Sequence, residues 1–159
     1  MRVGFGWDLH RLAEGGPLIL GGVEIPFERG SLGHSDGDVV FHAVTDAILG
    51  AAAAGDIGDH FKDSDQKWKD ARSFVFVKKA IELAAEKGFK VENIDITLVL
   101  EKPKLYDRKA EIVANIASLL SIDAGRVSFK AKTKEGLGDV GRGEAVECFA
   151  VALLVENSK

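Results

Sequence analysis

The spacing of hydrophobic residues along this chain changes from segment to segment, and each spacing predicts a different element. Over residues 2–10 large apolar residues alternate with glycine or polar residues, which is typical of a strand with two unlike faces. Further strands are predicted over residues 91–101, 126–134 and 147–155. The last of these is apolar on both faces and is therefore predicted to be central in the sheet. Residues 17–26 predict a hairpin that turns at Gly21-Gly22.

Three stretches place apolar residues at helical spacing. The first is predicted to begin near Asp36, with Ser35 or Asp36 as its N-cap, and to end before Gly55. The others cover residues 72–87 and 108–120. Together these elements predict an α/β fold of the two-layer α+β type. Its mixed sheet has four or five strands, with the helices mainly on one face.

Three further segments are predicted to lack regular structure. Residues 28–35 are interpreted as a loop, and residues 136–144 as a glycine-rich turn. Residues 55–70 are polar and aperiodic, and a loop of that length in a compact domain is a candidate lid over a site.

Composition and charge limit the classes of partner. A chain of 159 residues is expected to form one domain over 1–159, and 21 basic against 25 acidic residues give a net charge of −4. That balance argues against nucleic-acid binding. No stretch is long and apolar enough to span a membrane, so no membrane partner is expected. Cys148 is the single cysteine, which favours a reducing compartment and hence the cytoplasm.

Asp8 and His10 share one face of the first predicted strand, where their side chains can converge on one ion. Gly4 and Gly6 precede them on that face and are expected to leave room for a ligand. His42 lies in the first predicted helix. If this helix packs beside the strand, the three residues form a zinc site with one open position. The alternatives are an ordinary Asp–His ion pair and a satisfied core histidine.

Asp46 follows His42 by one helical turn and is predicted to orient its ring.

Two segments have residues suited to phosphate. His34 and Ser35 precede the first helix, where unpaired N–H groups favour anions. Thr133 and Arg142 flank a glycine-rich segment, and Glu135 could hold a hard cation such as Mg²⁺. For His34 and Ser35, the alternative is a plain helix cap. For the segment from Thr133 to Arg142, the alternative is the end of a solvated basic strand followed by a flexible hairpin.

Taken in order, the chain's motifs resemble those of the 2-C-methyl-D-erythritol 2,4-cyclodiphosphate synthase family. The match extends over nearly the whole chain. The motifs are Gly-x-Gly-x-Asp-x-His at 4–10, His-Ser-Asp-Gly-Asp at 34–38, His-Ala-x-Thr-Asp-Ala at 42–47, Gly-Asp-Ile-Gly at 55–58, Asp-x-Asp at 63–65, Lys-Pro-Lys at 102–104 and Gly-Arg-Gly-Glu at 141–144.

The resemblance implies a homotrimer whose active sites lie between neighbouring subunits. The implied substrate is a small nucleotide, 4-diphosphocytidyl-2-C-methyl-D-erythritol 2-phosphate, in the non-mevalonate isoprenoid pathway. Its 2-phosphate would attack the β-phosphorus of its own diphosphate, giving the cyclic diphosphate and CMP.

The resemblance also implies roles for individual residues. Asp8, His10 and His42 would hold one Zn²⁺ per subunit, and Glu135 a second divalent cation, Mg²⁺ or Mn²⁺. His34 and Thr133 would stabilise the transition state. Residues 56–58 would contact the erythritol, 100–106 the cytosine and 132–135 the diphosphate. The implied substrate-binding residues are Asp8, Leu9, His10, His34, Ser35, Asp56, Ile57, Gly58, Phe61, Lys62, Asp63, Ser64, Asp65, Leu100, Glu101, Lys102, Pro103, Lys104, Leu105, Tyr106, Lys132, Thr133, Lys134, Glu135 and Arg142.

Two other functions are compatible with the same residues. A zinc-dependent phosphohydrolase would use the same metal site, with Asp46 or Asp56 as the base that activates water. A non-catalytic trimeric module would bind cytidine nucleotides and turn over nothing.

Overall fold

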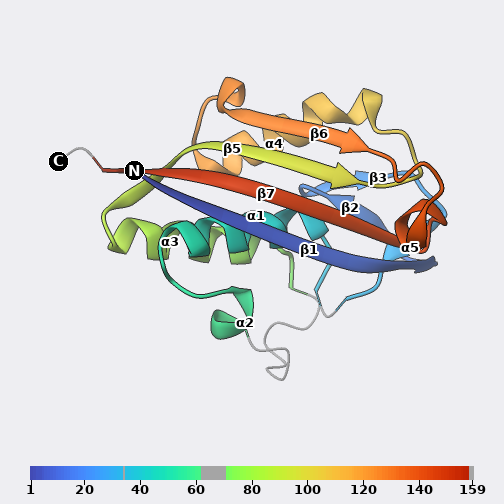
Figure 1. Cartoon of the computed structure of the whole chain (residues 1–159), viewed down its shortest axis with the longest axis horizontal. Coiled ribbons are helices and arrows are strands. Elements are labelled where there is room, and N and C mark those ends of the chain that lie inside the picture. The colour runs from blue at the N-terminus through green and yellow to red at the C-terminus, as the bar shows by residue number, and fades with distance from the viewer. Residues whose placement is uncertain (34, 62–70, 158–159) are drawn as a thin grey trace.

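The computed structural model describes residues 1–33, 35–61 and 71–157. Its main sheet has five strands in the order β4–β1–β7–β5–β6 (Figure 1). Only β5 and β6 are parallel, so the sheet is mixed, as the sequence predicted. The strands are β1 (Arg2–Glu14), β4 (Arg29–Ser31), β5 (Phe89–Val99), β6 (Val127–Lys132) and β7 (Ala145–Glu156), and a separate hairpin pairs β2 (Leu18–Leu20) with β3 (Val23–Ile25).

The last strand, β7, lies in the middle of this sheet. It pairs with β1 on one side and with β5 on the other, which confirms the prediction from its apolar sequence. Cys148, Ala150 and Ala152 are fully buried on its helix-facing side.

Three helices cover one face of the sheet (Figure 1): α1 (Val39–Ala51), α3 (Phe74–Glu86) and α4 (Lys109–Leu120). They confirm the three predicted helices and the two-layer arrangement. Four short elements complete the described fold: α2 (Ile57–His60), α5 (Gly138–Gly141) and the 3₁₀ turns η2 (Tyr106–Arg108) and η3 (Ala124–Arg126). Both short α-helices fall in segments predicted as irregular, because a single turn has too few residues to show a helical period.

The start of α1 corrects the prediction of Ser35 or Asp36 as N-cap. The cap is Asp38, whose carboxylate accepts from the N–H groups of Val40 and Phe41. The same carboxylate accepts from the Gly21 and Gly22 N–H groups in the β2–β3 turn. The buried Asp38 therefore fixes the hairpin and the helix start together.

Residues 29–31 also differ from the prediction, because they form an edge strand paired with β1 and not a loop.

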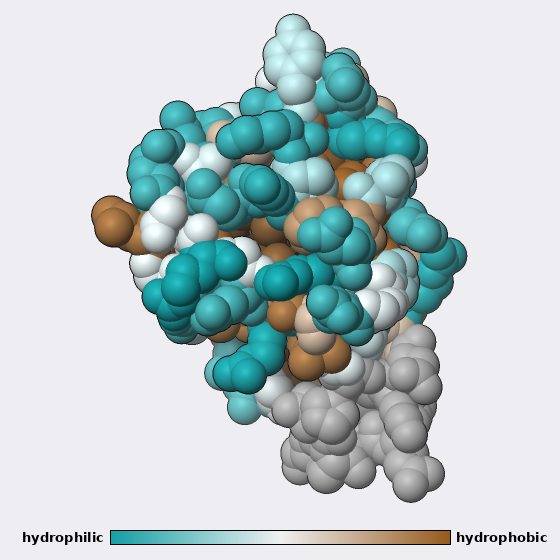
Figure 2. All heavy atoms as spheres, turned by 90° about the vertical axis from the view of Figure 1, so that its right-hand side faces the viewer, coloured by the Kyte–Doolittle hydropathy of each residue, from teal (hydrophilic) through white to brown (hydrophobic). Residues whose placement is uncertain are grey.

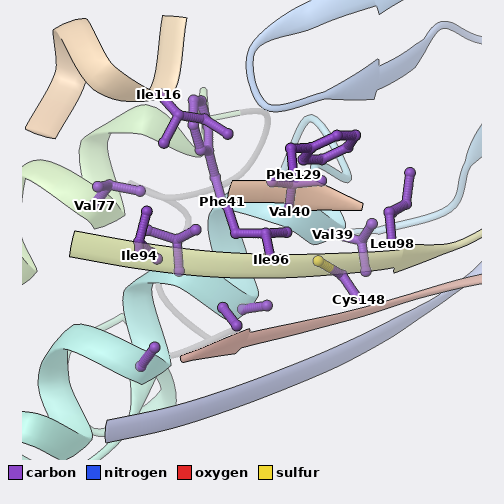
Figure 3. Packing of buried hydrophobic residues seen from close by; sticks show 14 of the residues in the cluster. Val39, Val40, Phe41, Val77, Ile94, Ile96, Leu98, Ile116, Phe129 and Cys148 are labelled. Atoms are coloured by element: carbon purple, nitrogen blue, oxygen red, sulfur yellow. The ribbon is translucent and has the colours of Figure 1, made fainter. Parts of the chain in front are cut away.

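The core lies between the helices and the sheet (Figure 3). Phe41 of α1 is almost fully buried, as are Ile94, Ile96 and Leu98 of β5. Ile116 of α4 belongs to the same cluster. This core holds α1 firmly against the middle of the sheet.

Gly4 and Gly6 have a different role from the one predicted. They face α1, and a Cβ atom on Gly6 would overlap the Ala43 carbonyl oxygen and lie 2.6 Å from the Ala47 amide nitrogen. The space beside these glycines is therefore occupied by a helix and not by a ligand. Their effect is to bring the α1 backbone directly onto β1.

The opposite face of β1 is apolar and exposed. Val3 is 67% exposed and Trp7 49%. We call Val3, Phe5, Trp7, Leu9 and Val151 the apolar strip. Contiguous exposed apolar surface of this kind marks a site of association.

No helix in the described part of the chain is both long enough and apolar enough to cross a membrane.

Candidate metal centre and active site

Asp8, His10 and His42 meet where β1 packs on α1. His42 Nδ1 lies 2.9 Å from Asp8 Oδ2 and 3.0 Å from His10 Nε2. The third side of this triangle, from His10 Nε2 to Asp8 Oδ2, is 3.1 Å. The close packing of Gly4 and Gly6 on α1 explains this convergence of residues 32 and 34 positions apart.

The three atoms fit a single metal ion. With bonds of 2.0–2.1 Å, two ligand atoms of a tetrahedral zinc ion lie about 3.3 Å apart, close to the observed edges. One carboxylate and two imidazoles are donors that divalent zinc accepts, and three protein ligands leave a fourth position for another molecule. These residues form the one group of candidate metal ligands found among the described residues.

The charges of the site also favour a cation. Burial on its own raises the pKa of Asp8, but hydrogen bonds and charge attraction from His10 and His42 hold it well below its usual range. Burial lowers the pKa of His42, yet the hydrogen bond and the charge of Asp8 raise it above its usual value. The Asp8 carboxylate is thus anionic at neutral pH, and a metal bound between Asp8 and His42 would displace a proton from His42 Nδ1.

The second ring nitrogen of His42 faces two serines and not Asp46. His42 Nε2 lies 2.9 Å from Ser73 Oγ and 3.1 Å from Ser35 Oγ. Asp46 instead accepts the Ile57 backbone N–H at 2.8 Å. The prediction that Asp46 orients the His42 ring is therefore wrong. Asp46 holds the start of α2 against α1, and burial raises its pKa.

Ser73 is the residue that the sequence analysis missed. It lies 31 positions from His42, and a serine before an apolar helical run is typical of an N-cap. Its hydroxyl donates a hydrogen bond to the carboxylate of Asp36. The two residues are therefore joined on the Nε2 side of the His42 ring, away from Asp8 and His10.

The predicted erythritol-binding segment lies next to α1. Asp56 is the N-cap of α2 and accepts from the Asp59 N–H. Ile57 begins the helix, and Gly58 follows on its exposed side. The hydrogen bond from Ile57 to Asp46 therefore places this segment one helical turn beyond the metal triad.

Phe61 is buried and its ring lies 4.6 Å from that of Phe76, which in turn packs 5.7 Å from the His42 ring. Phe61 and Phe76 therefore form an apolar wall beside the candidate metal centre.

Five predicted site residues lie outside the described part of the chain: His34, Lys62, Asp63, Ser64 and Asp65. Leu9 lies on the apolar strip, on the face opposite to Asp8 and His10.

A second group of predicted site residues gathers where β5 and β6 end. The Leu100 N–H donates to the Lys132 carbonyl at 2.9 Å, and the Glu101 carboxylate accepts from the Lys134 N–H at 3.2 Å. Thr133 donates its hydroxyl hydrogen bond to the carboxylate of Glu135. These contacts bring the segments 100–106 and 132–135 together at a largely hydrophilic end of the molecule (Figure 2).

Within residues 100–106, the side chains divide into two groups. Leu100 and Leu105 are buried and anchor the segment, whereas Tyr106 is 87% exposed. Glu101 and Pro103 are partly buried, and Lys102 and Lys104 are exposed.

The two groups of site residues are far apart within one chain. Leu9, Glu147, Val99 and Lys132 occupy one row across β1, β7, β5 and β6. Three strand intervals of about 4.8 Å separate the ends of this row by about 14 Å. The backbones of His10 and Thr133, one residue further along, are therefore also about 14 Å apart in one chain.

Arg142 forms ion pairs with the carboxylates of Asp139 and Glu144, 3.2 Å away in the case of Glu144. All three residues are exposed, whereas Val140, next to Asp139, is buried.

Comparison with known proteins gives close relatives over the full length. The YgbB family matches residues 1–155. A 2-C-methyl-D-erythritol 2,4-cyclodiphosphate synthase of Solibacter usitatus is 52% identical over 154 residues, which are 97% of each chain.

Two solved structures have the same fold. A 2C-methyl-D-erythritol-2,4-cyclodiphosphate synthase in its CDP-bound form superposes with a TM-score of 0.90 at 41% identity, covering 97% of this chain and 100% of that one. The bifunctional IspDF of Campylobacter jejuni superposes with a TM-score of 0.95 at 43% identity. That alignment covers 99% of this chain and 42% of the longer protein.

Proposed function

This chain belongs to the YgbB family, whose curated relatives are 2-C-methyl-D-erythritol 2,4-cyclodiphosphate synthases, and we propose how its own residues carry out that reaction. The enzyme converts 4-diphosphocytidyl-2-C-methyl-D-erythritol 2-phosphate to the cyclic diphosphate and CMP. An oxygen of the 2-phosphate forms a bond to the β-phosphorus, and the bond from that phosphorus to the oxygen bridging it to the α-phosphate breaks. The electron pair of the broken bond leaves with CMP. Both reacting groups belong to the substrate, so the protein's task is to position and neutralise them.

Asp8, His10 and His42 hold one zinc ion per subunit in this proposal. Bound zinc supplies a Lewis acid that polarises a phosphoryl oxygen. The triangle of donor atoms with edges of 2.9–3.1 Å is the observation that carries the proposal. Ser35, whose hydroxyl lies 3.1 Å from His42 Nε2, binds phosphate in this proposal. His34 stabilises the charge of the transition state.

The ends of β5 and β6 bind the nucleotide part of the substrate. Residues 100–106 receive the cytosine, while Lys132, Thr133 and Lys134 contact the diphosphate. Glu135 holds a second divalent cation, Mg²⁺ or Mn²⁺, whose preference for carboxylate oxygen suits this residue. Thr133 and Glu135 are already joined by a hydrogen bond, so the phosphate contact and the cation ligand are adjacent.

The active enzyme is a homotrimer in which each site is shared between two neighbouring chains. The separation of about 14 Å between His10 and Thr133 supports this, because both are needed at adjacent phosphates. The apolar strip on β1 and β7 gives a surface for the association. Each site then combines the metal centre of one chain with the 132–135 segment of another.

We propose a single catalytic domain over 1–159, in the cytoplasm.

Incubation with the diphosphocytidyl substrate tests the reaction directly. Mass spectrometry should detect CMP and the cyclic diphosphate in equal amounts, and a chelator that removes zinc should stop both. In water labelled with ¹⁸O the products should contain no label, because cyclisation consumes no water. Incorporated label would support a phosphohydrolase instead, and nucleotide binding without product would support a non-catalytic module.

A further inference from the structure

Ser73 occupies the N-cap position of α3, but it does not cap that helix. Its hydroxyl accepts no hydrogen bond from the first turn. A serine at this position ordinarily accepts a hydrogen bond from the N2 or N3 backbone N–H and so stabilises the helix. Here the side chain is fully buried and directed toward His42 and Asp36. The usual role of the residue is thus replaced by contacts behind the metal centre.

The direction of these hydrogen bonds follows from the protons available. The Asp36 carboxylate can only accept, and it receives both the Ser73 hydroxyl proton and the Ser73 backbone N–H, the latter at 3.1 Å. With its one proton used, Ser73 Oγ has only lone pairs for His42 Nε2, 2.9 Å away. His42 must therefore donate from Nε2. A neutral imidazole that carries its proton there has its lone pair at Nδ1, the atom facing Asp8 and His10.

Asp36 is itself fixed on several sides. Its backbone N–H donates to the Ala71 carbonyl at 3.2 Å, and its carboxylate accepts from the Asp38 N–H at 3.3 Å. Ser35 Oγ is also within 3.1 Å of His42 Nε2, but its side chain is only partly buried. Ser73, anchored by two contacts to Asp36, is the more rigid partner of the ring.

We propose that Ser73 is a positioning residue of the metal centre and that Asp36 acts through it. The pair selects the ring tautomer and the ring orientation that direct His42 Nδ1 at the metal. This inference rests on the proposed function of Asp8, His10 and His42 as metal ligands. It predicts that metal affinity depends on a hydroxyl group that contacts neither the metal nor the substrate.

The first test measures the zinc dissociation constant by competition with a chromophoric chelator. Ser73→Ala should weaken zinc binding about 10- to 100-fold, the range typical when an outer partner of a ligating histidine is removed. The matched control is Thr45→Val, which removes another fully buried hydroxyl from the helix that carries His42. The Thr45 hydroxyl donates only to the Phe41 carbonyl, at 2.7 Å, so this variant should keep the wild-type dissociation constant within about twofold.

A double-mutant cycle tests whether Asp36 acts through Ser73. Asp36→Asn should weaken zinc binding on its own. In the Ser73→Ala background the same change should have little further effect, because the contact that transmits it is gone. Full additivity of the two changes would overturn the proposed relay from Asp36 through Ser73.

Two further measurements separate the possible failures. Thermal unfolding of the metal-free proteins shows whether Ser73→Ala merely destabilises the fold; the proposal expects the melting temperature to stay near that of Thr45→Val. Asp8→Asn tests the metal centre itself and should abolish tight zinc binding. If Asp8→Asn loses zinc while Ser73→Ala keeps wild-type affinity, the role of Ser73 is refuted and the metal centre stands. If Asp8→Asn binds zinc like the wild type, both proposals are refuted.

Discussion

Gly6 lies so close to α1 that a Cβ atom on it would overlap the carbonyl oxygen of Ala43. Gly4 makes the equivalent approach to Ala47, one turn further along the helix. These contacts set the distance between β1 and α1, and therefore the distance between the ligands that the two elements carry. Two residues without side chains thus determine the geometry of the candidate metal centre.

Gly6→Ala should accordingly separate the strand from the helix. We expect a loss of about 3 kcal/mol or more in the free energy of unfolding, because neither backbone can move without disturbing the core. Zinc binding should weaken as well. The control is Gly50→Ala in α1, whose added Cβ would lie 3.8 Å from the Phe5 carbonyl oxygen. It should stabilise the protein by up to about 1 kcal/mol, as alanine does in a helix. Denaturant unfolding measures both; similar stability of the two variants would contradict this explanation.

Removal of a metal ligand should abolish activity and leave the fold intact. His42→Ala should reduce bound zinc from one equivalent per chain to nearly none and lower kcat about 10³-fold or more, equivalent to about 4 kcal/mol of transition-state stabilisation. His60→Ala removes a histidine that contacts the Ala54 carbonyl and should change neither quantity. Metal analysis and circular dichroism check the result. An active His42→Ala enzyme that keeps its zinc would refute the ligand assignment.

Mixing two inactive variants should restore activity if the site is shared. Asp8→Ala removes a proposed metal ligand and Thr133→Ala removes the proposed phosphate contact, so each variant alone should be inactive. In trimers reassembled from equal amounts, about one site in four should pair an intact metal centre with an intact Thr133 from its neighbour. Recovery should therefore approach a quarter of wild-type activity. No recovery after verified subunit exchange would place both residues in the same chain's site.

The apolar strip should be necessary for assembly. Phe5→Asp places a charge in the middle of the strip and should shift the protein to monomers, because a buried unpaired carboxylate is unfavourable in an interface. Leu32→Asp changes an apolar residue that is 52% exposed outside the strip and should leave the assembly unchanged. Light scattering at working concentration distinguishes them. A Phe5→Asp protein with the mass of the wild-type assembly would show that the strip is not the interface.

Asp38 should make stability depend on pH. Burial raises its pKa from 3.8 to about 6, although hydrogen bonds from the Gly22 and Gly21 N–H groups lower it. Between these values the folded protein binds more protons than the unfolded chain, so the stability linked to Asp38 decreases as pH rises from 4 to 6.

The Asp38→Asn variant cannot titrate and serves as the reference. In the metal-free protein, the wild type's free energy of unfolding minus that of Asp38→Asn should be about 1 kcal/mol larger at pH 5 than at pH 7.5. Chemical denaturation at the two pH values measures it. A difference that grows with pH would mean that Asp38 is ionised throughout and that its four N–H donors outweigh its burial.

The sequence predicted the elements with clear periods and missed those set by distant contacts. Alternation and helical spacing were sufficient for β1, β7 and the three long helices. The start of α1 was placed too early because Ser35, Asp36 and Asp38 are all good caps. The choice of Asp38 depends on Gly21 and Gly22, which reach its carboxylate from the hairpin.

The same limit applies to the site. Asp8 and His10 could be paired from strand geometry alone, since they are two residues apart. Their meeting with His42 depends on the close approach of α1 to β1. Gly4 and Gly6 were the sequence signal of that approach, but they were interpreted as space for a ligand. Asp46 was chosen to orient His42 because it is one turn away. The actual partner, Ser73, begins another helix, and local spacing carries no information about such a contact.

The central place of β7 has a consequence for the order of synthesis. β1 is made before the other strands of this sheet, yet its long edge pairs with residues 145–154. β5 likewise pairs with this strand along one edge. Until β7 has left the ribosome, both strands expose unpaired backbone groups, and the nascent chain presents the kind of edge that favours aggregation. We therefore expect the growing polypeptide to need protection by chaperones from the synthesis of β1 until that of β7, and the sheet to close only after β7 has been made.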